Sequence, residues 1–357
     1  MIMAGGTANH FWPVSRESKP KQFLDITGSG KSFIRTTYER FSKIVPARNI
    51  IVVTLARFSG LIREQIPELT EDNLLLEPYA RNTAPCIAFA TYNILKRDPD
   101  AIIVATPADH TIEDEDKFKA AILKTMDYAG NNAALMTIGI HPTEPDTSYG
   151  YIQAPGGKGE TENDIPLKVK TFTEKPDKAL AEVFCKTGEF YWNSGIFAWK
   201  ASVIKEEMEK YIPDVTSAFA GWEEAFGSAE EQRFIEKVYS DCPKLSIDYG
   251  VMEKTDKAWL FCGDFGWSDI DSWDSLSKSI DRKDRNGNVA YTGKVLSEGN
   301  EGDILVCKDK KKLYAVKGLK DYAIIDTDDV LLICPKDDKR VKDFLSGLGM
   351  PEYEDYR

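Results

Sequence analysis

The chain has 357 residues, of which 42% are hydrophobic, so it can bury a sizeable core. Its formal net charge of −12 argues against a sequence-independent nucleic-acid binder, because such proteins need a broad basic face. No stretch reaches the roughly 18 apolar residues of a membrane span, and the first residues lack the pattern of a signal peptide. The six cysteines are scattered without zinc spacing. We therefore expect a reduced, cytoplasmic protein with neither a nucleic-acid nor a membrane partner.

The first loop combines glycines with fixed positive charges. An apolar run at residues 1–4 ends in Gly5 and Gly6, and Arg16 and Lys21 follow. Glycines allow close backbone approach, and backbone N–H groups together with cations suit a phosphate chain. A Gly-Gly turn alone is as often only a turn. The two cations favour phosphate binding here.

Two common nucleotide-binding motifs are absent. Residues 28–32 resemble the end of a P-loop, but the first glycine of that motif would fall at position 25, which is Asp25. We interpret this stretch as a turn into a helix over residues 33–41, capped by Ser32. No dinucleotide-binding G-x-G-x-x-G is present, so hydride transfer has no support.

Short apolar runs alternate with amphipathic stretches through the first two thirds of the chain. The runs lie at 50–53, 74–76, 101–105 and 135–138, and a helix over 83–96 follows the second of them. This pattern predicts parallel strands covered by helices on both faces, a doubly wound α/β fold. Ligands bind such sheets beyond the carboxyl ends of the strands.

Carboxylates follow two of the predicted elements. Asp109 comes directly after the run at 101–105, and Asp269 is flanked by Trp267 and Trp273. Two such carboxylates suit Mg²⁺, which takes a few protein oxygens and completes its shell with water and phosphate. Either aspartate alone is somewhat better explained as a helix N-cap or a solvated loop residue, and only their pairing across one site would favour the metal.

Two further segments carry polar groups in a binding context. Glu174 and Lys175 follow a strand-like run, where the simpler explanation is an exposed ion pair. Asn193 lies between aromatic and aliphatic residues, a composition that suits a sugar pocket. A buried structural asparagine is about as good an explanation of that segment alone.

The pattern changes near residue 282, after a strongly charged stretch at 281–288. Short β-type runs follow at 303–307, 313–316 and 322–325, and a closing helix is predicted over 339–348. We therefore predict a large domain over residues 1–281 and a small β-rich domain over residues 282–357.

A set of motifs in a fixed order resembles the mannose-1-phosphate guanylyltransferases, also called GDP-mannose pyrophosphorylases. The motifs are Met3-Ala4-Gly5-Gly6, Trp12-Pro13-Val14-Ser15-Arg16, Pro20-Lys21-Gln22-Phe23, Glu77-Pro78, Arg81-Asn82-Thr83-Ala84-Pro85, Pro107-Ala108-Asp109-His110, Tyr149-Gly150-Tyr151-Ile152, Glu174-Lys175-Pro176, Trp192-Asn193-Ser194-Gly195-Ile196-Phe197, residues 246–253 and Trp267-Ser268-Asp269. Because the chain ends before the isomerase domain of the longer members, it resembles the monofunctional type.

The resemblance implies a Rossmann-like nucleotidyltransferase domain with a doubly wound mixed sheet. It also implies a small C-terminal domain that is left-handed β-helix-like and often contributes to dimers, so a homodimer is expected. The implied reaction joins GTP and α-D-mannose 1-phosphate into GDP-mannose and pyrophosphate, by Mg²⁺-assisted in-line attack without a covalent intermediate.

The resemblance also implies roles for individual residues. Lys21, Arg16 and Asp109 would be catalytic, and Asp109 and Asp269 would hold Mg²⁺. The nucleotide would contact Ala4, Gly5, Gly6, Thr7, His10, Glu77, Asn82 and Thr83. Mannose 1-phosphate would contact Gly150, Glu174, Lys175, Asn193 and Asp248.

The glycine loop departs from the family pattern. Ala8 stands where the family has a third glycine, and His10 stands where it has an arginine. Losing a charge-assisted phosphate contact would lower the rate about ten- to a hundredfold. The first strand is also short, which is consistent with a misassigned or trimmed start. The alternatives are a catalytically weakened sugar-nucleotide-binding protein and a nucleotidyltransferase for another sugar 1-phosphate or another base.

Overall fold

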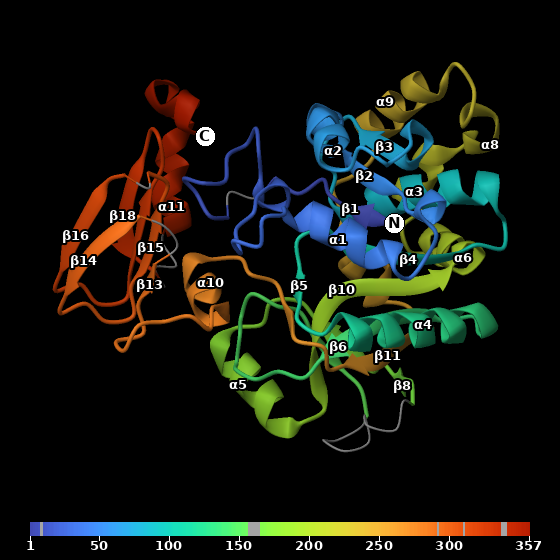
Figure 1. Cartoon of the computed structure of the whole chain (residues 1–357). Coiled ribbons are helices and arrows are strands. Elements are labelled where there is room, and N and C mark those ends of the chain that lie inside the picture. Colours follow the sequence, from blue (N-terminus) through green and yellow to red (C-terminus); the bar gives the residue numbers. More distant parts are fainter. Residues whose placement is uncertain (8–9, 156–164, 291–292, 310, 337–340) are drawn as a thin grey trace. The chain divides into compact units, whose positions relative to one another are not determined.

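The computed structural model describes residues 1–7, 10–155, 165–290, 293–309, 311–336 and 341–357 (Figure 1). It forms two units. Unit 1 consists of Met1–Gly5 and Thr37–Ser268, and unit 2 consists of Gly6–Thr36 and Asp269–Arg357. The predicted boundary near residue 282 stays a prediction. Each unit is described separately below.

Unit 1 is built on a ten-stranded sheet with the main strand order β3-β2-β1-β4-β10-β6-β11-β8. Its strands are β1 (Ile2–Met3), β2 (Val52–Leu55), β3 (Leu74–Glu77), β4 (Ile102–Pro107), β6 (Leu135–Ile140), β7 (Tyr151–Gln153), β8 (Leu167–Lys168), β9 (Thr171–Thr173), β10 (Phe190–Lys200) and β11 (Ala258–Gly263). A separate two-stranded ladder pairs β5 (Thr111–Ile112) with β12 (Trp267–Ser268).

The first half of this sheet is parallel and the second half is mixed. Strands β1 to β4 run parallel, as the short apolar runs predicted, with Ile2 opposite both Val52 and Thr106. The long strand β10 is antiparallel to both β4 and β6. Its register shifts between Asn193 and Phe197, so the polar segment of this strand leaves the regular ladder at a bulge.

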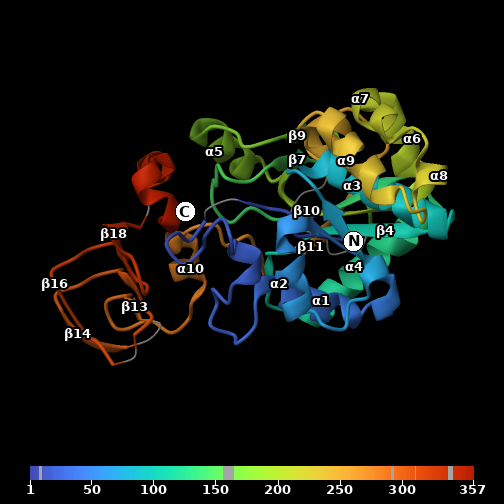
Figure 2. The ribbon, with the colours of Figure 1, turned by 90° about the horizontal axis from the view of Figure 1, so that it is seen from above.

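Helices cover both faces of the sheet. Figure 2 shows α3, α6 and α9 on one side of the strands and α4 on the other. The helices of this unit are α2 (Ser59–Gln65), α3 (Thr83–Arg97), α4 (Glu115–Asn131), α5 (Lys178–Thr187), α6 (Ala201–Tyr211), α7 (Pro213–Thr216), α8 (Trp222–Ala225) and α9 (Glu231–Asp241), and α1 (Phe33–Ser42) spans the junction with unit 2. The predicted helices over 33–41 and 83–96 are thus confirmed. None of the helices in the described part of the chain combines the length and apolar character needed to cross a bilayer.

The main core of unit 1 lies between the sheet and helices α3, α6 and α9. Helix α3 is buried almost all round, including Ile87, Phe89 and Tyr92. Burying a side chain of this size contributes roughly 1.5–3 kcal/mol. This packing fixes the amino end of α3, where the predicted site residues Asn82 and Thr83 lie.

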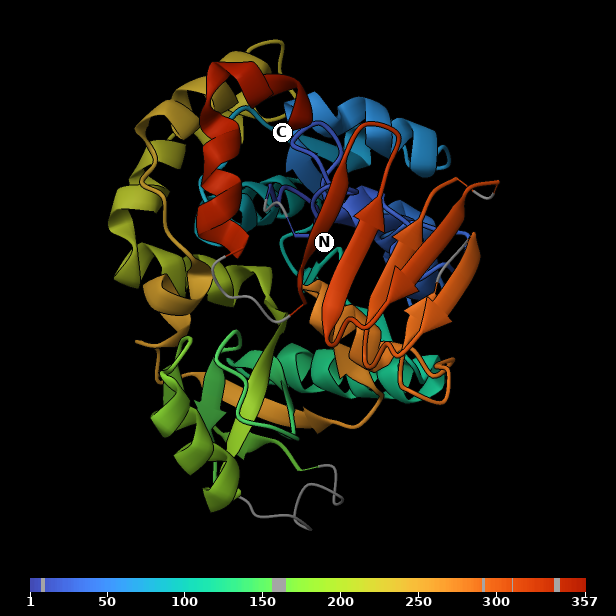
Figure 3. The same cartoon turned by 90° about the vertical axis from the view of Figure 1, so that its left-hand side faces the viewer.

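Unit 2 contains the loop after Gly5 and the C-terminal β strands. Figure 3 shows these strands side by side, in orange to red. Its elements are α10 (Trp273–Ser279), β13 (Val289–Ala290), β14 (Lys294–Glu298), β15 (Ile304–Cys307), β16 (Leu313–Lys317), β17 (Tyr322–Asp326), β18 (Leu331–Pro335) and α11 (Val341–Ser346). One sheet has the order β13-β15-β17-β18 and another pairs β14 with β16. The predicted β runs and closing helix are confirmed, and residues 339–340 of that helix lie outside the described residues.

Candidate active site

A buried carboxylate lies at the carboxyl end of β3. The Glu77 side chain is only 4% exposed, and its Oε1 accepts a hydrogen bond of 2.9 Å from the hydroxyl of Tyr239 on α9. Its Oε2 faces Gly5, where an added Cβ would approach that oxygen to 2.8 Å. The structure therefore brings together two predicted nucleotide-binding residues, Gly5 and Glu77, and gives a reason for glycine at position 5.

Burial sets the proton affinity of Glu77. Loss of hydration raises its pKa to about 7, and the hydrogen bond from Tyr239 acts in the opposite direction. Around neutral pH this side chain can therefore exist either as a hydrogen-bond donor or as an acceptor. A carboxylate held in this way can read a base whose edge offers N–H donors.

The loop after β3 is tied to a distant segment of unit 1. Asn82 has a φ of 68°, and its side-chain oxygen caps α3 by accepting from the Thr83 backbone N–H at 2.9 Å. The Thr83 hydroxyl accepts from the backbone N–H of Ile247 at 2.9 Å. Leu245 donates its N–H to the carbonyl of Arg81 and accepts from the N–H of Ala84. These bonds fix residues 78–83, called the base loop below because Asn82 and Thr83 are predicted to contact the nucleotide, against residues 245–247.

The predicted sugar-phosphate residues come together in unit 1. The Asn193 side-chain amide donates to Asp248 Oδ1 at 2.8 Å, and its backbone N–H donates to the Gly150 carbonyl. Glu174 lies over Gly150, and its Oε1 is 3.7 Å from the ammonium of Lys175. All five residues proposed for this half, Gly150, Glu174, Lys175, Asn193 and Asp248, therefore form one group.

Carboxylates dominate the electrostatics of that group. Burial raises the pKa of Asp248, against the hydrogen bond from Asn193. Burial, and then the charge of Asp248, raise the pKa of Glu174 and of Glu253. Carboxylate and amide oxygens accept hydrogen bonds from hydroxyl groups, whereas they repel phosphate. This half is therefore suited to the ring of a sugar, with Lys175 as its cation.

A substitution at Gly150 would show how closely the residues of this group are packed. We expect Gly150→Ala to raise about tenfold the KM for mannose 1-phosphate, the substrate that the motif resemblance implies, because the new Cβ would lie 2.4 Å from Glu174 Oε2 and displace that carboxylate. The KM for GTP should stay within about twofold, and steady-state kinetics measures both. Gly60→Ala is the matched control, since its added Cβ would meet no atom of the described residues within 4 Å apart from its chain neighbours and the backbone of its own helix. Equal effects of the two variants would contradict the placement of Glu174.

Unit 2 supplies a buried cation. Lys21 lies in a 3₁₀ turn, Lys21–Phe23, and is 2% exposed. Its ammonium donates to Asp269 Oδ1 at 2.7 Å and lies 5.3 Å from the centre of the Phe33 ring. Gln22 donates to the carbonyl of Gly6, which holds the start of the glycine loop within the same unit.

Arg16 contacts the C-terminal segment of unit 2. Its guanidinium donates to the carbonyls of Pro13 and Tyr356 and to Asp329 Oδ1 at 2.8 Å. A side chain held by three acceptors is firmly oriented. The catalytic role of Arg16 stays a prediction.

The remaining residues of the glycine loop divide between the two units. Ala4 is buried in unit 1, where its N–H bonds to Val53. Thr7 is half-buried in unit 2, and His10 Nδ1 is 2.8 Å from the Asp271 carbonyl. Ala8, the other departure from the family pattern, lies outside the described residues.

The two predicted metal ligands belong to different units. Asp109 is half-buried after β4 in unit 1, and Asp269 is one third exposed in unit 2. Among the described residues, no cluster of three or more side chains forms a ready metal site. Carboxylate oxygens nevertheless fit Mg²⁺, which is often held by one or two carboxylates with water and substrate phosphate.

Sequence reasoning missed two residues of this arrangement. Tyr239 lies on an amphipathic helix, where its pattern is that of a core residue, and nothing in the sequence pairs it with Glu77. Glu253 belongs to the quoted motif at 246–253 but was given no role. The helix-like turn that begins at Asp248 carries it toward the same group, and this short spacing is the signal that could have found it.

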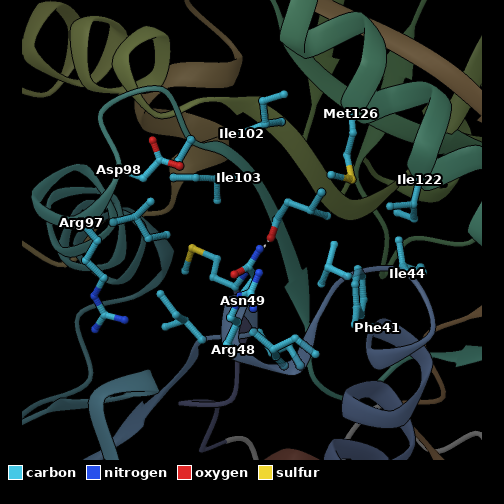
Figure 4. Close-up of a pocket in the computed structure, with 18 residues that line it drawn as sticks. Phe41, Ile44, Arg48, Asn49, Arg97, Asp98, Ile102, Ile103, Ile122 and Met126 are labelled. Atoms are coloured by element: carbon cyan, nitrogen blue, oxygen red, sulfur yellow. Dashed lines mark hydrogen bonds between the residues drawn. The ribbon is translucent and has the colours of Figure 1, made fainter. Parts of the chain in front are cut away.

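A large hollow in unit 1 lies away from these residues. It has a volume of about 360 Å³ and is lined mainly by apolar side chains, among them Ile44, Ile102 and Ile122 (Figure 4). It lies at the amino ends of β2 and β4, whereas Gly5, Glu77 and Asp109 lie at carboxyl ends. None of the predicted site residues is among the described residues that line it.

The fold and these residue groups define a nucleotidyltransferase. The sequence model of the Nucleotidyl transferase family matches residues 1–285. A crystal structure described as mannose-1-phosphate geranyltransferase from Thermus thermophilus superposes with a TM-score of 0.85 at 28% identity, covering 98% of both chains. That match extends through both units.

Curated relatives make the family more specific. Mannose-1-phosphate guanylyltransferase 2 of Escherichia coli O157:H7 is 36% identical over all of this chain and 74% of its own length. Mannose-1-phosphate guanylyltransferase of Salmonella montevideo is 38% identical over 96% of this chain and 72% of its own length. Xanthan biosynthesis protein XanB of Xanthomonas campestris is 38% identical over 94% of this chain and 70% of its own length. The chain belongs to the mannose-1-phosphate guanylyltransferase family, and the resemblance found in the sequence motifs is confirmed.

Proposed function

We propose that this chain transfers GMP from GTP to α-D-mannose 1-phosphate, giving GDP-mannose and pyrophosphate. The observation that carries the proposal is the pairing of two recognition groups in unit 1. One is the buried carboxylate of Glu77 beside Gly5, and the other is the set of oxygen acceptors around Asn193 and Asp248. Such groups suit a base with N–H donors and a ring with several hydroxyls.

The base is read by the groups around β1, β3 and α3. Guanine offers N1–H and an amino group on one edge, and ionised Glu77 accepts hydrogen bonds from such donors. The other residues that we assign to the nucleotide are Ala4, Gly5, Asn82 and Thr83. The observations that support this assignment are the close packing of Gly5 on Glu77 and the hydrogen bond between Thr83 and Ile247. Adenine presents an unprotonated N1 at this position, which would leave the buried carboxylate unpaired.

The chemistry is a displacement at the α-phosphorus of GTP. A phosphate oxygen of mannose 1-phosphate forms the new P–O bond as the bond to pyrophosphate breaks, so pyrophosphate leaves with the electron pair. Catalysis then consists of positioning and charge neutralisation. We assign Lys21 to the phosphates, because it is a buried cation with a fixed ammonium. Gly6, Thr7 and His10 would lie along the same loop. For Arg16, the proposal requires a phosphate to replace Asp329 as its partner.

The proposal includes a magnesium ion, because the carboxylate oxygens available here are ligands that suit it. Asp109 and Asp269 would hold the ion, and when bound it would neutralise charge on the phosphate oxygens. The bond between Lys21 and Asp269 places a cation beside one of these carboxylates.

The architecture of the second domain is part of the proposal. We infer a catalytic domain over residues 1–281, supported by the family match to 1–285, and a C-terminal domain built of β-helix-like coils. The support for the coils is that β13, β15 and β17 pair in parallel in one sheet, and β14 and β16 in another. The chain thus alternates between two parallel stacks. A homodimer through this domain and a cytoplasmic location complete the proposal, the latter supported by the free cysteines.

The test follows pyrophosphate release from GTP, mannose 1-phosphate and Mg²⁺. We expect turnover that depends on all three, with GTP preferred to ATP and UTP and with mannose 1-phosphate preferred to glucose 1-phosphate. Faster turnover with another pair would identify a different nucleotidyltransferase. Binding of GDP-mannose without turnover would contradict the proposal and favour a sugar-nucleotide-binding protein.

A further inference from the structure

The hydroxyl of Tyr239 is the described hydrogen-bond partner of a carboxylate that is almost closed to solvent. Tyr239 is 0% exposed, Glu77 is 4% exposed, and the two side chains are joined at 2.9 Å. They come from α9 and β3, which lie far apart in the sequence. A buried polar pair of this kind is strongly directional, because neither group can readily turn to water instead.

The tyrosine is also held at its backbone. The guanidinium of Arg81, in the base loop, donates from Nε to the Tyr239 carbonyl at 2.9 Å. The carbonyl of Arg81 accepts in turn from Leu245. The phenol ring packs edge-on against Phe89 of α3 at 6.2 Å between ring centres. Both ends of Tyr239 are therefore fixed, and its hydroxyl points at one place.

We propose that Tyr239 is the positioning residue for base selection: it holds Glu77 Oε1 so that the carboxylate plane and Oε2 meet the N–H edge of guanine. This inference rests on the proposed function and adds a residue to it. Without the hydroxyl, the carboxylate loses its fixed orientation at Oε1. The N–H donors of guanine would then meet a group of less defined geometry, and discrimination against bases lacking those donors would fall.

The same bond affects the charge that the base meets. A hydroxyl donor favours the ionised carboxylate, which acts against the effect of burial on Glu77. The titratable groups that interact with the Glu77 charge are Tyr239 on α9 and Cys86 on α3, and burial raises the pKa of both. Neither is charged near neutral pH. A difference between the pH profiles of two variants with the same ligand therefore reports on Glu77, because the titration of the ligand itself is common to both.

The experiment measures equilibrium binding of GDP and IDP to the full chain between pH 6 and 9. IDP lacks the amino group of guanine. For Tyr239→Phe we expect GDP to bind about tenfold more weakly at pH 7, and the advantage of GDP over IDP to shrink from about tenfold to about twofold. The loss should diminish toward pH 9, where Glu77 is ionised without help. The KM for mannose 1-phosphate should stay within about twofold of that of the wild type.

Tyr92→Phe is the matched control, because Tyr92 is buried in the same core cluster and has no bond to Glu77. It should leave both affinities unchanged. If Tyr239→Phe retains the GDP preference and the pH profile of the wild type, the inference is wrong, whether or not the chain turns over GTP. Absence of turnover in the wild type would contradict only the proposed function, since the binding comparison needs no catalysis.

A second measurement tests the inference if Tyr239→Phe does not fold. Replacing tyrosine by 3-fluorotyrosine throughout the Tyr92→Phe chain makes the Tyr239 hydroxyl a stronger donor. The pH below which the affinity for GDP falls should then be lower. An unchanged pH dependence of the affinity would contradict the inference.

Discussion

Lys21→Met is expected to lower kcat/KM for GTP about 10²- to 10³-fold, the range found when one preorganised charge-stabilising group is removed. The Lys21 ammonium is fixed before substrate arrives, because it is 2% exposed and bonded to Asp269 at 2.7 Å. A cation held in this way needs no reorganisation when charge develops on the phosphates. Initial rates of pyrophosphate release at varied GTP measure the effect.

Two controls separate this charge from general damage. Lys43→Met removes a lysine that is 63% exposed and paired with Glu115 at the surface, and it should change the rate less than twofold. Asp269→Asn keeps Lys21 but weakens its anchor, and should cost activity mainly at low Mg²⁺ concentration. A loss below about fivefold for Lys21→Met, with the fold intact by circular dichroism, would remove Lys21 from the catalytic set.

The sequence predicted much of the fold because its signals were local. The apolar runs became β2, β3, β4 and β6, and the helix predicted after Asn82 became α3. The antiparallel course of β10 did not follow from those signals. Asn193 and Gly195 interrupt the apolar pattern of that strand, and its direction depends on pairing with β4 and β6.

The candidate site was predictable where motifs marked it. Asn193, Asp248, Gly150 and Glu174 were predicted from separate motifs and form one group in the structure. Tyr239 was not predictable, because its role exists only through a contact between α9 and β3. A residue that acts only through a tertiary contact with another side chain produces no recognisable spacing pattern in a single sequence.

Glu77→Gln should remove a pH-dependent destabilisation of about 3 kcal/mol. The pKa of Glu77 is raised from 4.5 to about 7 in the folded state. Between these values the unfolded chain has lost a proton that the folded chain keeps, so stability is full below about pH 4.5 and falls as pH rises through about 7. Each pKa unit is worth about 1.4 kcal/mol. Glutamine cannot ionise, and its side-chain oxygen can still accept from Tyr239.

The measurement is urea unfolding of both proteins from pH 4.5 to 8.5, taken as the difference between them. Taking the difference isolates Glu77, because all other titratable groups are common to the two proteins. The stability of the variant relative to the wild type should rise by about 3 kcal/mol over this range and level off above pH 7. A constant difference would mean that Glu77 ionises as it does in water.

Glu77→Gln should also abolish the preference for GTP over ATP. The glutamine amide would direct its own N–H donors toward the N–H donors of guanine, so that no hydrogen bond could form between them. Glu77 would then be a group whose ionised form lowers the stability of the empty protein and is stabilised by the bound base. Such residues are common where a binding site must hold a buried charge. GDP should therefore raise the unfolding midpoint of the wild type more than that of Glu77→Gln, and most strongly above pH 7.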